Sequence, residues 1–188
     1  MDSKPKELLL YFLKFLFTFC ILYYGTIGMV GITAPGGYYS AFADKYLDYV
    51  SGLRWLLLHG AVFILNITGF DIYLKDIYTI KMQNGVGVHV GYDCIGYGVM
   101  AFWIAFIFAN QLHWKLKLKW IFGGLLLIFF INVIRICLML VAVNQRWKSP
   151  LNMDNHTWFN IAAYLAIFTM MWFFDQSQKK QGVQLESE

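Results

Sequence analysis

Charged residues are scarce in this chain of 188 residues. Only 14% are Asp, Glu, Lys or Arg, whereas 59% are hydrophobic and 19% are aromatic. Soluble domains carry about 25% charged residues, so lipid is the expected solvent for much of this surface. The net charge of +4 comes from basic residues at the ends of apolar runs. That pattern is typical of membrane orientation, and no nucleic-acid-binding motif accompanies it.

Cysteine is also scarce, with Cys20, Cys94 and Cys137 as the only three. An odd number predicts no disulfide framework. Cys20 and Cys137 lie inside apolar runs, where a cysteine usually acts as a small, inert hydrophobe. Cys94 lies at the polar edge of a run and is therefore the candidate for a reactive thiol. The first apolar run lacks a small-residue cleavage site, so we interpret it as a retained span.

The length and hydropathy of the runs predict an all-α integral membrane helical bundle, a single membrane domain over residues 1–188. We expect about four transmembrane helices, at residues 8–32, 94–109, 120–143 and 156–174. Residues 38–51 predict an interfacial helix with tyrosines at headgroup level. Residues 53–67 are compatible with a thin span or a re-entrant helix. The polar tail 176–188 is expected to be disordered.

A change of period predicts a small β-hairpin over about residues 78–91. Two alternating runs flank Asn84-Gly85, which is the strongest short-range signal for a hairpin. Because open strand edges are not stable in hydrocarbon, the hairpin should lie outside it, on the extracytoplasmic side.

The lysines predict the orientation of the helices. With four crossings, all the basic clusters fall on one side, which is then the cytoplasm with both termini: Lys4, Lys6, Lys115, Lys117, Lys119, Lys179 and Lys180. A crossing by residues 53–67 would separate the N-terminal lysines from the others, so we favour a model without it. Cys94 and His156 then lie at the outer ends of their spans. Arg135 lies eight residues, or about 12 Å, below the outer end of the third span, and its side chain would reach up.

These residues could form a catalytic site. A thiolate at Cys94 would be the nucleophile, favoured by a helix N-terminus, and His156 could exchange protons with it. An intramembrane arginine is a functional-site hypothesis by default, and Arg135 could stabilise an oxyanion. In the alternative interpretation, Cys94 and His156 serve packing and capping, and Arg135 is a structural partner of Asp93 or Asp154.

Other histidines compete with His156 for the role of base. His59 and His89 are rivals on the same predicted side, and the topology excludes His113. The open edge of the hairpin, or the groove beneath it, could hold an extended peptide by strand addition. Asp93 would oppose thiolate formation unless it caps the helix.

Three sequence segments together resemble the exosortase/archaeosortase family over about residues 86–174. They are Asp93-Cys94-Ile95-Gly96, Asn132-Val-Ile-Arg135-Ile136 and His156. The resemblance implies a multi-pass membrane transpeptidase with a Cys94, Arg135 and His156 triad. Ile95 and Thr157 depart from the common family pattern, in which a small polar residue and an acid are frequent. These two departures bear on the substrate motif.

The resemblance implies a membrane-embedded cysteine protease or transpeptidase in a bacterial cytoplasmic membrane, with its active site facing outward. Its partner would be an exported protein with a C-terminal transmembrane sorting signal, bound from the lipid, and the acyl product would pass to an acceptor. No metal or organic cofactor is implied. We expect Asn132, Asp93 and His89 to contact the substrate. The alternatives are a non-enzymatic assembly or scaffold protein for surface export and, third, a transporter. The sequence predicts neither the acceptor nor the oligomeric state.

Overall fold

The computed structural model describes residues 3–34, 38–147 and 155–185, with side chains for 5–34, 38–147 and 157–178. Within them the helices are α1 (Ser3–Thr33), α2 (Ala41–Leu47), α3 (Tyr49–Ile67), α4 (Tyr97–Ala109), α5 (Trp114–Asn144) and α6 (Asn155–Leu185). The strands are β1 (Ile72–Leu74), β2 (Thr79–Met82) and β3 (Gly87–His89), and a single 3₁₀ turn, η1 (Tyr92–Cys94), precedes α4.

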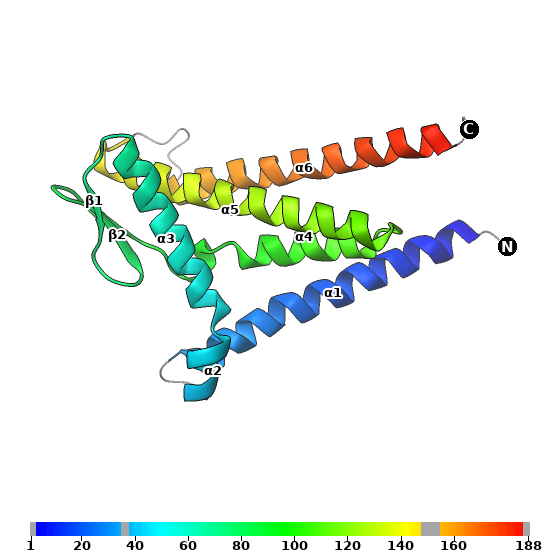
Figure 1. Ribbon diagram of the computed structural model, residues 1–188, viewed down its shortest axis with the longest axis horizontal. Helices are drawn as coiled ribbons and strands as arrows, with labels where there is room; N and C mark the ends of the chain where they lie inside the picture. The colour runs from blue at the N-terminus through cyan, green and yellow to red at the C-terminus, as the bar shows by residue number, and fades with distance from the viewer. Residues whose placement is uncertain (1–2, 35–37, 148–154, 186–188) are drawn as a thin grey trace.

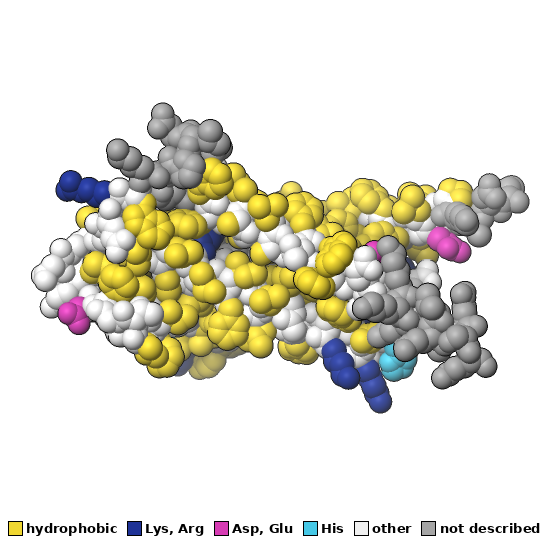
Figure 2. Space-filling model, turned by 90° about the horizontal axis from the view of Figure 1, so that it is seen from above, with side chains coloured by type: hydrophobic (Ala, Val, Ile, Leu, Met, Phe, Trp, Pro, Cys, Tyr) yellow, Lys and Arg dark blue, Asp and Glu magenta, His cyan; other side chains and the backbone are white. Residues whose placement is uncertain are grey.

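The long helices form an elongated bundle. In Figure 1, α1, α4, α5 and α6 run along the long axis of the molecule, and α4 packs between α1 and α5. The start of α1 and the end of α6 lie at one end, and the sheet lies at the other. Figure 2 shows a mainly hydrophobic flank, with lysine or arginine side chains near the ends. The predicted helical membrane bundle is confirmed.

Helix lengths separate the apolar helices into two groups. Four are long and apolar enough to cross a membrane, over Pro5–Thr33, Tyr49–Ile67, Trp114–Asn144 and Thr157–Gln178, whereas the apolar helix Tyr97–Ala109 is shorter. A helix of 13 residues rises only about 20 Å, less than the roughly 30 Å of hydrocarbon. The helix at 49–67 meets the length criterion, but in Figure 1 it is steeply inclined to the other long helices.

The predicted hairpin is present and belongs to a larger sheet. β2 and β3 pair antiparallel, with Ile80 opposite Val88, and β1 adds a third antiparallel strand on the other side of β2. Asn144, at the end of α5, fixes the turn to the bundle. Its amide oxygen accepts a hydrogen bond from Val86 N at 2.7 Å, and its amide nitrogen donates to Val86 O at 3.0 Å.

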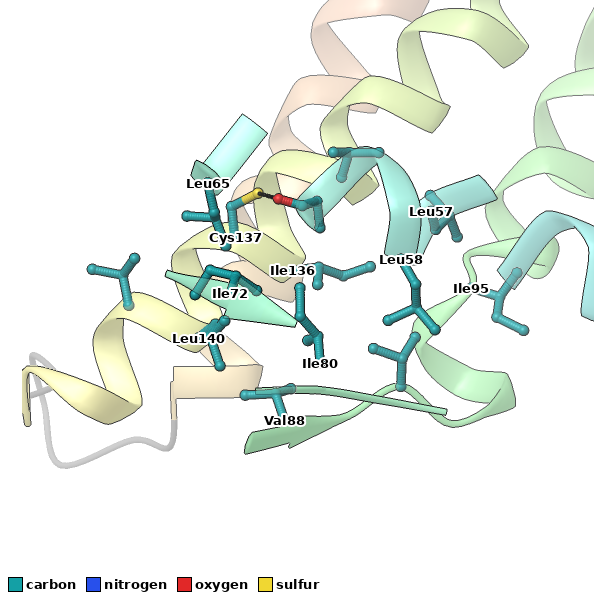
Figure 3. Packing of buried hydrophobic residues seen from close by; sticks show 14 of the residues in the cluster. Leu57, Leu58, Leu65, Ile72, Ile80, Val88, Ile95, Ile136, Cys137 and Leu140 are labelled. Carbon is teal, nitrogen blue, oxygen red and sulfur yellow. Dashed lines mark hydrogen bonds between the residues drawn. The ribbon is translucent and has the colours of Figure 1, made fainter. Parts of the chain in front are cut away.

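One face of the sheet closes the main hydrophobic core. Figure 3 shows apolar side chains from α3, α5, the sheet and the segment after η1 meeting there: Leu57, Leu58, Leu65, Ile72, Ile80, Val88, Ile95, Ile136, Cys137 and Leu140. The Cys137 thiol is buried and faces the Ala61 carbonyl at 3.7 Å. This core fixes α3 and the sheet against the C-terminal half of α5.

Three boundaries differ from those expected from the sequence. α5 begins at Trp114, so the lysines at 115, 117 and 119 lie on its first turns, ahead of the start expected at residue 120. α6 continues to Leu185, so the expected disordered tail from residue 176 is helical as far as that residue. Cys94 does not open α4, which begins three residues later at Tyr97.

Candidate functional site

Cys94 lies in a tight turn instead of on a helix. Its amide nitrogen donates to Gly91 O at 3.1 Å, and the next amide, of Ile95, donates to Tyr92 O at 3.2 Å. Gly96 follows in the left-handed region, with φ of 81°, and is the N-cap of α4. The expected location at a helix N-terminus is therefore wrong by three residues, because a glycine with positive φ ends the turn before the helix starts.

Asn132 of α5 anchors this turn. Its side-chain nitrogen donates to the Ile95 carbonyl at 3.1 Å, and its side chain is 5% exposed. A Cβ at Gly96 would collide with the same amide. The loop after Cys94 thus fits closely against one point of α5. Asn132 was expected to contact the substrate, whereas in the structure its amide contacts the backbone next to Cys94.

Arg135 lies one turn further along the same face of α5. It is 7% exposed, and residues three apart on a helix are neighbours. Asn132 is twelve residues from the end of α5 at Asn144, a rise of about 18 Å. The Cys94 turn therefore does not lie at the outer end of the bundle above Arg135, as expected, but at the level of Asn132, further from that end. Helical side chains lean toward the N-terminus of their helix, which directs Arg135 toward the turn that Asn132 holds.

His156 belongs to the first turn of α6, which begins at Asn155. Its side chain lies outside the described side chains, and Asp154 lies outside the described residues. Figure 1 shows α6 beginning alongside α5. The helix start expected at His156 is therefore present.

The other histidines differ in their surroundings. His89 is exposed, its Nδ1 is 3.5 Å from the Thr79 hydroxyl, and its ring lies beside that of Tyr78 in a tilted arrangement with centroids 5.7 Å apart. A Cβ built on Gly91 would lie 4.0 Å from the His89 ring, which places His89 beside the turn that carries Cys94. This side chain stays a rival base.

Two further histidines have structural partners. His59 is exposed, its Nδ1 is 2.8 Å from Trp55 O, and its ring packs against the Trp55 ring in a tilted arrangement. His113 is the N-cap of α5 and accepts a hydrogen bond from Lys115 N. It precedes the first residue of α5, at the opposite end of that helix from Asn144, and its exclusion by topology stays a prediction.

Asp93 is exposed within η1. The N-cap of α4 is Gly96, with no side-chain cap hydrogen bond, so the condition under which Asp93 would not oppose a thiolate, capping of the helix, is not met. An exposed carboxylate is well hydrated, which weakens its repulsion of a neighbouring thiolate.

Arg54, which lies in the apolar helix α3, was not among the functional residues expected from the sequence. It is 2% exposed, and its guanidinium lies between two tyrosine rings, 4.4 Å from the centroids of Tyr78 and Tyr92. Its Nε and Nη2 atoms are buried without a hydrogen-bond partner. An arginine inside an apolar run was the available signal, the same one that identified Arg135. Tyr92 begins the turn that ends at Cys94, so this cation contacts the first residue of the turn that carries the candidate nucleophile.

Comparison with known proteins identifies one match. The profile of a family described as transmembrane exosortase matches residues 9–174, most of the chain. No curated protein and no solved structure gives a match. The family match extends well beyond the segments that carried the resemblance, and it includes the N-terminal half.

Proposed function

The chain belongs to the transmembrane exosortase family, and from this premise we propose that it is a membrane-embedded cysteine transpeptidase. It cleaves the C-terminal sorting signal of an exported protein and transfers the new C-terminus to an acceptor. The observation that carries the proposal is the docking of the Cys94 turn on the face of α5 that holds Asn132 and Arg135.

The first step forms a thioester. Cys94 gives its proton to His156, and the thiolate attacks the carbonyl carbon of the scissile peptide bond. Arg135 stabilises the negative charge that develops on the carbonyl oxygen. As the tetrahedral intermediate collapses, His156 returns the proton to the leaving amine, and the fragment carrying the membrane anchor departs.

The second step releases the product. An acceptor nucleophile attacks the thioester carbonyl and loses its proton to His156, and Cys94 leaves as a thiol. Asn132 holds the backbone next to Cys94 throughout, which supports a fixed direction of attack. Water, an amine and a lipid headgroup would each complete the cycle with the same balance of protons.

The location of the site supports a substrate that is itself anchored in lipid. The Cys94 turn lies between the apolar helices and the sheet, at the sheet end of the bundle. A transmembrane anchor lying beside the bundle would bring the adjoining polar peptide to this level. We place the sheet end on the extracytoplasmic side, because lysines gather at the opposite end of the helices.

The experiment compares Cys94→Ala with Cys20→Ala and Cys137→Ala in the cells that make this protein. Membrane proteins are digested and searched for exported proteins that keep their C-terminal anchors. Accumulation of uncleaved protein in the Cys94 variant alone, at normal levels of the variant in the membrane, supports the transpeptidase. Normal processing in that variant would leave a scaffold role in export as the better description.

A further inference from the structure

The guanidinium of Arg54 is an unusual buried cation. Two tyrosine rings cover its faces, yet Nε and Nη2 make no hydrogen bond. Contact with an aromatic face offsets part of the cost of burying a positive charge. It leaves the in-plane N–H donors unsatisfied, and a buried donor without a partner destabilises the fold. Among the described residues, no carboxylate forms an ion pair with Arg54, so an external anion would complete this site.

A cavity adjoins this cation. Its volume is about 770 Å³, and its wall includes Tyr78 and Tyr92, the two rings that enclose the guanidinium. Ser51, one turn before Arg54 on α3, lines the same cavity. Arg54 itself is not part of the cavity wall, and its Nε and Nη2 are buried, so a ligand in the cavity reaches them only when one of these half-buried rings moves aside. We call this space the Arg54 cavity.

The mouth of the Arg54 cavity carries two carboxylates. Asp44 accepts a hydrogen bond from the Tyr39 hydroxyl through Oδ2, and Asp48 accepts one from Ser51 N through Oδ1. The second oxygen of each carboxylate has no hydrogen-bond partner in the described part of the chain. The two carboxylates would repel a simple anion. A ligand that carries an ammonium group beside its anionic group would match both the carboxylates and the buried Arg54.

The surroundings of the cavity indicate where such a ligand comes from. Thr33, the last residue of α1, lines it, so it opens where a long apolar helix ends. The neighbouring helix α2 exposes Phe42 and Tyr46 by 67% and 63%, and Tyr39 at the mouth is 50% exposed. Exposed aromatic residues at the end of a span are typical of the headgroup level of a membrane.

We propose that the Arg54 cavity binds the headgroup of a zwitterionic phospholipid, with the phosphate on Arg54 and a primary ammonium between Asp44 and Asp48. The acyl chains of the lipid remain in the bilayer beside α1 and α2. This site is separate from the peptide-cleaving chemistry and does not depend on it. One lipid bound there would contact α2, α3 and η1 and so fix their positions relative to one another.

The test uses the full chain in nanodiscs with equal amounts of phosphatidylethanolamine and phosphatidylglycerol, followed by native mass spectrometry. We expect one retained phosphatidylethanolamine per chain, preferred several-fold over phosphatidylglycerol. Arg54→Met should lower this retention about tenfold, and Arg54→Lys should restore part of it. Asp44→Asn should remove the preference for the ammonium lipid while phospholipid binding remains.

Lys45→Gln is the matched control, because it removes a cation from the same short helix, outside the cavity wall. It should retain lipid as the unmodified chain does. Equal retention of both lipids by the unmodified chain would overturn the proposal. Unchanged retention in Arg54→Met would also overturn it, and if that variant fails to fold, unchanged preference in the exposed Asp44→Asn variant decides against it. Displacement of the lipid by an equal concentration of soluble phosphoethanolamine would contradict the proposal, because the site would then favour a soluble phosphate compound over a phospholipid of the bilayer.

Discussion

At the scale of single residues, two arginines are buried inside apolar helices, Arg54 in α3 and Arg135 in α5. Arg135 was identified because charge inside an apolar span is costly. The same reasoning applied to Arg54, but its tyrosine partners come from the residue before β2 and from η1, far along the chain, and no local pattern predicts that contact. The depth of Cys94 was also beyond the sequence, since it depends on the hydrogen bond between Asn132 and Ile95.

Asn132 provides a test of how the turn is positioned. Asn132→Leu removes the donor to the buried Ile95 carbonyl, and we expect a loss of about 1–3 kcal/mol in stability. Processing of the exported substrate should fall by at least about tenfold, because a small misplacement of the nucleophile is costly. Thermal unfolding in detergent and the ratio of cleaved to uncleaved substrate measure the two effects.

Asn110→Leu is the matched control for this variant. Asn110 also donates from its side-chain nitrogen to a backbone carbonyl, that of Phe106, at the far end of α4. It should lose stability without loss of processing at equal protein level. An equal loss of processing in both variants would show that Asn132 acts through general stability alone.

Arg135 tests the stabilisation of the oxyanion. In the proposed reaction, Arg135→Lys keeps the charge but loses the planar fork of donors. Removal of one such donor lowers kcat by about 10²–10³ in other acyl-transfer enzymes, and we expect a loss of processing of that order with normal membrane insertion. Arg146→Lys, at an exposed arginine after α5, should process normally. Full activity of Arg135→Lys would exclude a geometry-dependent role.

At the scale of elements, the pairing of α4 and α5 depends on one glycine. Trp103 is fully buried, its indole nitrogen donates to Trp120 O at 3.0 Å, and a Cβ at Gly124 would collide with its ring. The sequence predicted both helices from hydropathy. It could not predict which glycine would face the tryptophan, because that depends on the rotation of one helix against the other.

Adjacent glycines offer a matched pair for this contact. Gly124→Ala should lower stability by about 1–3 kcal/mol, because the indole must move and overpacking strains the core. Gly123→Ala meets no atom within 4 Å and should leave stability unchanged or slightly raised, since alanine favours helix. Melting temperatures in the same detergent compare them. Equal effects of the two substitutions would contradict the close approach at Gly124.

At the scale of the whole molecule, hydropathy predicted the bundle and the alternating pattern predicted the hairpin. The sequence left open whether residues 53–67 cross the membrane. That segment forms a helix of 19 residues that passes the length criterion, yet Figure 1 shows it inclined across the sheet end of the bundle. Length and apolarity alone cannot distinguish these arrangements, because the direction of a helix is set by its packing partners.

Labelling of single cysteines tests the topology. If α3 does not cross, Tyr38→Cys and Val86→Cys lie on the same side, and an impermeant maleimide should label both in intact cells. Gln111→Cys, at the other end of the bundle, should react only after permeabilisation. All three positions are exposed. Labelling of only one of the two positions that flank α3 would show that this helix spans the membrane.

The central claim is that Cys94 forms a thioester with a peptide. The most direct measurement treats the membrane-purified protein with hydroxylamine and identifies the released hydroxamate by mass spectrometry. Modification of each cysteine is mapped in parallel. The proposed mechanism predicts a peptide hydroxamate released from Cys94 and none from Cys20 or Cys137. A fatty-acyl hydroxamate from Cys94, or a Cys94 thiol that stays unmodified while substrate is processed, would contradict it.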